Sequence, residues 1–127
     1  MTPAAILVVD DDAPIRRMLS RTLTAEGYAV EASPDGGTAL AAVERSAPDL
    51  VVEVLSPATA DRDTDLKTKI YARFGVKEMW IADPDAKTVA VLTNSGEGFL
   101  RDGLFRQGEL LRSPLLPALT IPLDEIF

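Results

Sequence analysis

The chain has 127 residues, 46% of them hydrophobic, and carries 13 Lys and Arg against 20 Asp and Glu, which gives a formal net charge of −7. It contains no Cys and no His, which excludes disulfide frameworks, thiolate or imidazole metal sites and every catalytic triad that needs an imidazole. A chain of this length can close one hydrophobic core, so we expect residues 1–127 to form a single domain.

The acidic balance excludes a broad basic surface for nucleic acid, because such surfaces draw their affinity from Lys and Arg side chains that neutralise phosphates. A small local basic site for DNA is still compatible with this charge. The early apolar run, Ala4 to Val9, stops at Asp10 and is too short for a signal-peptide core or a membrane span. We therefore expect a cytoplasmic protein without a membrane segment.

The first half of the chain alternates predicted strands and helices. Ile6 to Val9 is a short apolar run rich in β-branched residues, which is typical of a strand covered on both faces. Residues 13–26 carry apolar side chains at helical spacing, with Asp11 or Asp12 as N-cap and Gly27 as the stop. The further elements expected here are a strand at 28–32, a cap at Asp35, a helix at 38–45 and a strand at 50–55. Short connections through helices predict parallel pairing in the order 2-1-3.

The second half begins in the same way and then changes. A helix is predicted near 62–74, where Leu66, Ile70 and Phe74 form an apolar stripe, and a fourth parallel strand is predicted at 78–82. Turn-rich clusters then favour antiparallel strands. These are expected at 88–92, 99–101 and 118–121. We predict an α/β fold in three layers, with a parallel 2-1-3-4 sheet from a βαβαβαβ unit that is extended by C-terminal antiparallel strands.

The first half resembles a known signalling domain. The segment ILVVDDDAPIRRMLSRTLTAEGYAVEASPDGGTALAAVERSAPDLVV, within residues 5–52, is similar to the first half of a response-regulator receiver domain. The resemblance implies a flavodoxin-like fold in which Asp10 and Asp11 help to hold magnesium. The receiver's phosphoacceptor aspartate falls at Val54 in this sequence, so the resemblance implies that the phosphoacceptor is absent.

The second half resembles a different family. The segment PDLVVEVLSPATADRDTDLKTKIYARFGVKEMWIADPDAKTVAVL, and the chain around it over residues 48–127, is similar to the C-terminal part of the Uma-type restriction endonucleases, a branch of the PD-(D/E)XK nuclease superfamily. By this resemblance Glu53 is the acidic residue of the metal-binding strand. Asp63 and Lys67 lie on the following helix, with Lys67 as the displaced motif lysine. The family's earlier metal-binding aspartate lies in a segment that the chain lacks, which implies an incomplete site.

The two halves, 1–52 and 53–127, therefore read as a hybrid that overlaps in PDLVV. Carboxylates at the carboxyl ends of adjacent parallel strands share one crevice, so Asp10, Asp11 and Glu53 are the candidate ligands of Mg²⁺ or Mn²⁺. The alternation of side chains along a strand limits whether Glu53 can join this ligand set. Since Val54 occupies the receiver's acceptor position, Glu53 should face the opposite side of the sheet unless a bulge re-aims it.

Each candidate residue also has an ordinary structural interpretation. Asp11 and Asp12 fit a helix cap, and Asp63 and Lys67 fit an exposed ion pair worth about a few tenths of a kcal/mol. Glu53 differs, because a charged side chain inside an apolar strand costs roughly several kcal/mol when it is buried alone. It needs a partner or solvent. The aromatic side chains expected in the core, rather than as platforms for bases, are Tyr71, Phe74 and Trp80.

The leading functional interpretation is an endonuclease-like domain with an incomplete magnesium-dependent phosphodiesterase site, in which Glu53, Asp63 and Lys67 carry the chemistry. The missing aspartate leaves open whether the domain is active. One alternative is a degenerate receiver module that binds a cation or a partner without accepting phosphate. Another is a fold hybrid with no selected activity. A junction between unlike halves can also leave apolar surface exposed, so a homodimer is a further expectation.

Overall fold

The computed structural model describes residues 3–10, 13–55 and 62–127, with residues 62–65 as backbone only. The first half contains strands and helices in strict alternation. They are β1 (Ala5–Val9), α1 (Ala13–Ala25), β2 (Ala29–Ser33), α2 (Gly36–Arg45) and β3 (Leu50–Val54). The second half adds one helix, five strands and a short 3-10 helix. They are α3 (Arg62–Arg73), β4 (Glu78–Asp83), β5 (Thr88–Asn94), β6 (Phe99–Arg106), β7 (Leu110–Arg112), β8 (Thr120–Pro122) and η1 (Leu123–Glu125).

A six-stranded sheet with the order β2-β1-β3-β4-β5-β6 forms the centre of the fold. The pairs from β2 to β4 are parallel, and the pairs β4–β5 and β5–β6 are antiparallel. This confirms the predicted 2-1-3-4 parallel sheet and its antiparallel extension. The two halves of the sequence therefore share one continuous sheet, which passes through β3 and β4.

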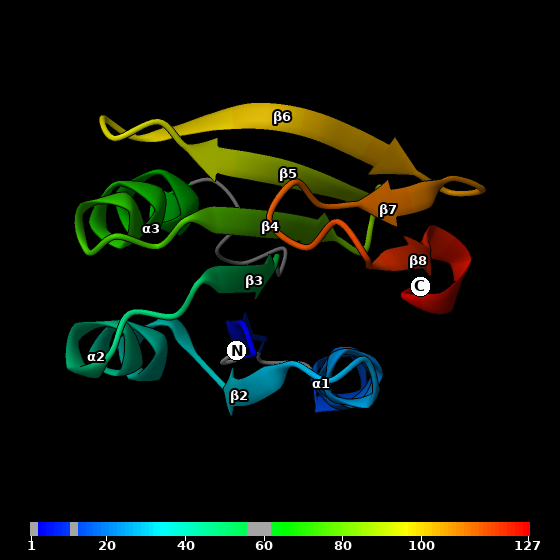
Figure 1. The fold of residues 1–127 in the computed structure, drawn as a ribbon, viewed down its shortest axis with the longest axis horizontal. Helices are drawn as coiled ribbons and strands as arrows, with labels where there is room; N and C mark the ends of the chain where they lie inside the picture. Colours follow the sequence, from blue (N-terminus) through cyan, green and yellow to red (C-terminus); the bar gives the residue numbers. More distant parts are fainter. Residues whose placement is uncertain (1–2, 11–12, 56–61) are drawn as a thin grey trace.

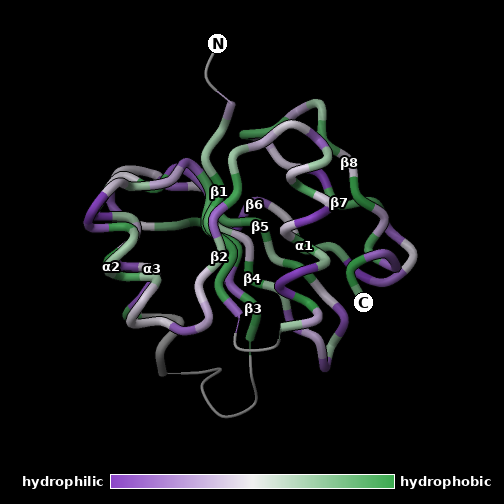
Figure 2. The backbone as a smooth tube through the Cα atoms, turned by 90° about the horizontal axis from the view of Figure 1, so that it is seen from below, coloured by the Kyte–Doolittle hydropathy of each residue, from purple (hydrophilic) through white to green (hydrophobic). Residues whose placement is uncertain are grey.

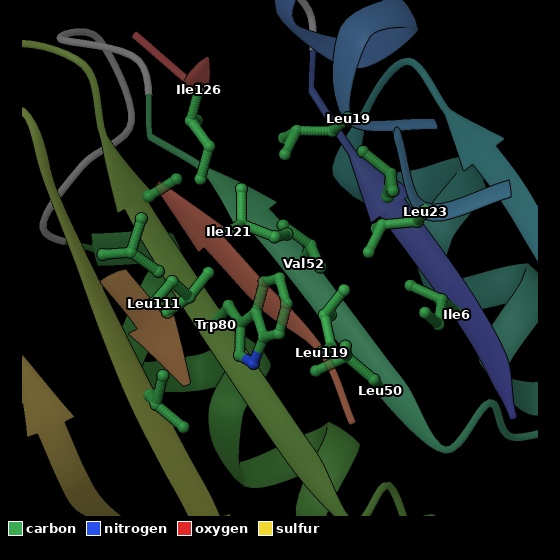
Figure 3. Packing of buried hydrophobic residues seen from close by; sticks show 14 of the residues in the cluster. Ile6, Leu19, Leu23, Leu50, Val52, Trp80, Leu111, Leu119, Ile121 and Ile126 are labelled. Atoms are coloured by element: carbon green, nitrogen blue, oxygen red, sulfur yellow. The ribbon is translucent and has the colours of Figure 1, made fainter. Parts of the chain in front are cut away.

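The sheet lies between two unlike layers (Figures 1 and 2). On one face, α2 and α3 cover a cluster that includes Leu7, Val51 and Tyr71. On the other face, α1 lies beside the two-stranded β7–β8 sheet and the C-terminal turn. The cluster under this second layer includes Trp80 and Val52, and Figure 3 shows how side chains from α1, β7 and β8 converge on it. The three-layer α/β architecture is as predicted.

Local sequence signals place the helices of the first half. Gly27, which follows α1, has φ 96°, a left-handed conformation that glycine adopts without steric cost, and the helix ends before it. Asp35 caps α2, since its carboxylate accepts a hydrogen bond from the N–H of Thr38 at 2.8 Å. The predicted cap of α1 at Asp11 or Asp12 lies outside the described residues.

The predicted apolar stripe on α3 is not its buried face. Leu66 is 62% exposed and Phe74 is 43% exposed, whereas Tyr71 is fully buried. The expectation that Phe74 belongs to the core is therefore wrong, while those for Tyr71 and Trp80 are confirmed. Successive residues on a helix are about 100° apart, so burying Tyr71 instead of Ile70 amounts to one residue's rotation of the helix.

The C-terminal segment is joined to the sheet by a buried carboxylate. Glu78, at the start of β4, is 1% exposed. Its Oε2 accepts hydrogen bonds from Trp80 Nε1, at 2.9 Å, and from the hydroxyl of Ser113. Its Oε1 accepts one from the backbone N–H of Leu115 at 3.1 Å. Three donors thus compensate the buried charge, and two of them, Ser113 and Leu115, belong to the segment between β7 and β8.

None of the helices in the described part of the chain has the length and apolar character needed to cross a bilayer.

Candidate functional site

Glu53 is the one charged residue of β3, a strand that is buried along its whole length. Val52 and Val54 belong to the cluster on the α1 side of the sheet, and Val51 belongs to the cluster under α2 and α3. Since side chains alternate along a strand, Glu53 faces α2 and α3 together with Val51. This is the orientation that strand alternation predicted, opposite to Val54. Glu53 is 5% exposed, so its charge needs a partner.

Lys67 of α3 supplies that partner. Its Nζ lies 2.7 Å from Glu53 Oε1, within the range of a short charge-assisted hydrogen bond. The side chain of Lys67 is 15% exposed and that of Glu53 is 7% exposed. This excludes the interpretation of Lys67 as half of an ordinary exposed pair. The ion pair joins the strand acid and the helix lysine that the nuclease resemblance singled out.

The first turn of α2 lies against the same ammonium group. A Cβ atom added to Gly36 would lie 2.7 Å from Lys67 Cε and 2.8 Å from Lys67 Nζ. The hydrogen bond from Thr38 lowers the pKa of the neighbouring Asp35 carboxyl below its ordinary value of 3.8, and the charge of Lys67 lowers that pKa further. The lysine therefore lies between β3 and the beginning of α2.

Tyr71 is a site residue that the sequence alone predicts only as part of the core. Burial raises the pKa of its phenol far above the ordinary value of 10.0, and the nearby charge of Glu53 raises that pKa further. The hydroxyl is buried and has no hydrogen-bond partner among the residues that the structure describes. A usable signal existed, because Tyr71 follows Lys67 by four positions and so shares its face of α3.

The other predicted site residues are not all described. Asp10 is 2% exposed and directly follows Val9, which is paired in register with Glu53. Arg16 of α1 donates a hydrogen bond to the main-chain oxygen of Asp10. Asp11 lies outside the described residues. Asp63 lies one turn before Lys67 in α3, where only the backbone is described. Across the described ranges, no three or more acidic residues gather in a group that could hold a metal ion.

Comparison with known proteins finds two kinds of relative. The model of the Uma2 family, described as "Putative restriction endonuclease", matches residues 25–124. The response regulator MprA of Mycobacterium sp. (strain KMS) is 46% identical over 56 residues, which are 43% of this chain and 24% of that protein. The chain thus spans about a quarter of the length of this curated relative.

The similar solved structures are likewise of two kinds, a receiver protein and a putative nuclease. The chemotaxis protein CheY4 of Vibrio cholerae superposes with a TM-score of 0.54 and 27% identity, over 63% of this chain and 68% of its own. A putative nuclease of DUF820 from Anabaena variabilis superposes with a TM-score of 0.51 and 24% identity, over 63% of this chain and 44% of its own, and shows the fold alone. The predicted hybrid of receiver-like and nuclease-like resemblances is confirmed.

The family match begins well before the predicted overlap at residues 48–52. It includes α2 as well as β3 and α3, and therefore covers Gly36, Glu53, Lys67 and Tyr71. The three elements that are described in contact with the ion pair thus lie inside one family match.

Proposed function

Because the chain belongs to the Uma2 family of putative restriction endonucleases, we propose that it is a metal-dependent endonuclease-like domain of the PD-(D/E)XK type that acts on DNA. Glu53 and Lys67 are its central pair, and Asp63 is assigned to the same site by its place on α3. The site is proposed to be incomplete, because the resemblance leaves the earlier metal-binding aspartate without a counterpart. We place the domain in the cytoplasm, where both DNA and magnesium are present.

The observation that carries the proposal is the 2.7 Å contact between Lys67 Nζ and Glu53 Oε1. A buried ion pair is weak evidence of stability, because removing two charges from water costs free energy that a pair of apolar residues would not require. A chemical use for the pair explains why a charged strand residue and a charged helix residue occupy this part of an apolar layer. Acid and lysine held together in a poorly hydrated site are suited to charge stabilisation during phosphodiester cleavage.

The donor chemistry of the site fits Mg²⁺ or Mn²⁺. Both ions prefer hard oxygen ligands, and Glu53 supplies a carboxylate at the end of a parallel strand. We propose Asp10 and Asp11 as the further ligands on the receiver resemblance alone, since strand alternation directs Asp10 to the face of the sheet opposite to Val9 and Glu53. When bound, such an ion would lower the pKa of a coordinated water and polarise the scissile phosphate.

The protein's own residues have separable roles in this proposal. The carboxylate of Glu53 anchors the site. Lys67 balances the charge of Glu53 before substrate binds, and its ammonium offsets the negative charge that develops on the phosphate. Tyr71, with its raised pKa, stays neutral at physiological pH and adds no second negative charge beside Glu53.

The small local basic site for DNA is assigned to the outer side of α3. Lys69 and Arg73 are exposed there and line a groove of about 360 Å³. The turn between β5 and β6, residues 96–98, forms the other wall. These two cations can neutralise phosphates close to the helix that carries Lys67, in keeping with a local contact rather than a broad basic surface.

Plasmid cleavage in Mg²⁺ or Mn²⁺ tests the proposal. We expect nicking or linearisation that Glu53→Gln and Lys67→Ala each abolish. Lys77→Ala is the matched control, because Lys77 forms a 3.4 Å ion pair with Asp49 in which the lysine side chain is 67% exposed. Absence of cleavage at every concentration of either metal would remove the nuclease function.

The receiver-like similarity supports a second candidate, a degenerate receiver module. Its specific support is the identity with MprA and the superposition on CheY4. Val54 stands where the resemblance expects the phosphoacceptor, and it is buried in the apolar cluster on the α1 side. In this proposal the module binds a partner or a cation without being phosphorylated. A titration with beryllofluoride, a phosphoryl mimic, should produce no change in Trp80 fluorescence, and a saturable change would contradict the assignment of Val54.

A further inference from the structure

We infer that Gly36 is a positioning residue for Lys67: the missing side chain at the start of α2 leaves the space in which the lysine reaches Glu53. The consequence for catalysis rests on the proposed nuclease function, whereas the consequence for the ion pair does not. Helix α2, which lies both in the receiver-like half and inside the Uma2 match, would thereby contribute to the nuclease-like site.

Space, rather than backbone conformation, explains the glycine at this position. Five glycines of the described chain have positive φ, and Gly36 is not among them. A Cβ atom on Gly36 would instead approach Lys67 Cε to 2.7 Å and Lys67 Nζ to 2.8 Å. Carbon atoms in ordinary contact lie about 3.5–4.0 Å apart, so the end of the lysine would have to move by about 1 Å.

The lysine, rather than the helix, should give way. The crowded atoms are the end of a flexible side chain, whereas the first turn of α2 is held by the hydrogen bond between Asp35 and Thr38. Alanine is also a better helix former than glycine. Lys67 Nζ already lies at the short limit of a charge-assisted hydrogen bond with Glu53, so the displaced ammonium cannot move closer to the carboxylate. The displaced ammonium can only keep or lengthen this contact, and we expect it to lengthen because the methyl group would crowd the positions that Lys67 Cε and Nζ now occupy.

The neighbouring Gly37 provides a matched control. A Cβ atom there would meet only Asp35 Oδ1, at 3.5 Å, which is an ordinary contact distance. Gly36→Ala and Gly37→Ala change the same kind of residue in the same helical turn, with a similar gain in helix propensity. They differ in whether the added methyl group collides with Lys67.

The experiment compares Gly36→Ala and Gly37→Ala in the wild-type chain and in a Lys67→Ala background. Crystal structures should show that Gly36→Ala lengthens the Lys67–Glu53 contact from 2.7 Å, while Gly37→Ala leaves it unchanged. In plasmid cleavage, Gly36→Ala should lower kcat by about 100-fold, the scale of a 1 Å misplacement, with little change in KM. Gly37→Ala should stay within about twofold of wild type. In the Lys67→Ala background, where cleavage is expected to be abolished, the readout is the thermal midpoint: Gly36→Ala and Gly37→Ala should shift it equally there, since the group that Gly36 positions is gone.

The readouts separate the two proposals. If no variant and no wild-type protein cleaves DNA, the nuclease function fails, and the crystallographic distance alone decides the role of Gly36. An unchanged 2.7 Å contact in Gly36→Ala, or equal kcat values for the two alanine variants, would overturn the inference. If Gly36→Ala does not fold, the double variant with Lys67→Ala decides: recovery of folding supports a collision with Lys67, and continued failure to fold refutes it.

Discussion

Replacing Lys67 with methionine tests how strongly the stability of the fold depends on the buried ion pair between Lys67 and Glu53. The substitution removes the ammonium group and keeps most of the apolar stem. At 2.7 Å, the attraction between the two charges is about 6 kcal/mol at an effective dielectric constant near 20, and desolvation offsets much of it. The variant would leave the carboxylate of Glu53, 7% exposed, without this cation. We therefore expect the free energy of unfolding to fall by about 3–5 kcal/mol, the usual result of breaking a buried pair from one side.

Urea denaturation, followed by Trp80 fluorescence, measures this loss. Removing both charges with Glu53→Leu and Lys67→Met should restore most of the stability, because no buried charge is then left uncompensated. Lys77→Met, in the exposed pair with Asp49, should change the free energy of unfolding by less than about 0.5 kcal/mol. A loss below about 1 kcal/mol for Lys67→Met would refute the reasoning, since exposed pairs behave in that way.

Three further substitutions have defined outcomes. Tyr71→Phe should leave the free energy of unfolding at pH 7 unchanged or raise it by up to about 1–3 kcal/mol, because it removes a buried hydroxyl without a partner among the described residues. Since the folded-state pKa of Tyr71 is raised, wild-type stability should be full below pH 10.0 and fall above it, and urea titrations at pH 7 and 11 should show a smaller fall in the variant. Asp35→Asn should lower the thermal midpoint at pH 7. Because the folded-state pKa of Asp35 lies below 3.8, the difference between the variant and the wild type should disappear as the pH falls through that lower value. A difference that persists at pH 2 would contradict a stabilising role for the ionised Asp35 carboxylate. Glu78→Gln should lower the free energy of unfolding by about 2 kcal/mol in urea, because an amide cannot accept from all three donors, and an unchanged midpoint would argue against the buried network.

The order of the strands could be predicted because apolar runs alternate with capped, amphipathic segments. Each run in the first half is bounded by a turn residue such as Gly27 or a cap such as Asp35, and such signals are local. The orientation of Glu53 also followed from local geometry, since strand alternation needs only the position of Val54. These features depend on neighbours in the sequence, and the structure confirms them.

The buried face of α3 could not be predicted in this way. The stripe of Leu66 and Phe74 competes with the face that carries Lys67 and Tyr71, one residue's rotation away. Leaving Leu66 exposed costs about 1.5–3 kcal/mol relative to burial, whereas burying Glu53 without its cation costs several kcal/mol or more. The sheet therefore selects the face of the helix, and this choice depends on a contact between residues 14 positions apart.

The short strand β7 was missed for a related reason. It contains three residues, and its segment is tied to the sheet through Glu78, which is 35 positions before Ser113. No periodicity can emerge from three residues. The assignment of Asp10, Asp11 and Asp63 to the site stays a prediction.

The change from parallel to antiparallel pairing at β4 also has a kinetic consequence. Strands β4, β5 and β6 are joined by short turns, so their pairing closes small loops, and hairpins of this kind form in about 1–10 μs. The pairs β1–β3 and β3–β4 each require a helical crossover and close much longer loops. We expect the antiparallel unit of β4, β5 and β6 to nucleate folding. The edge of β4 that is not paired with β5 would then be the template on which β3 docks. In hydrogen-exchange pulse labelling, amides of β5 should then become protected before those of β1.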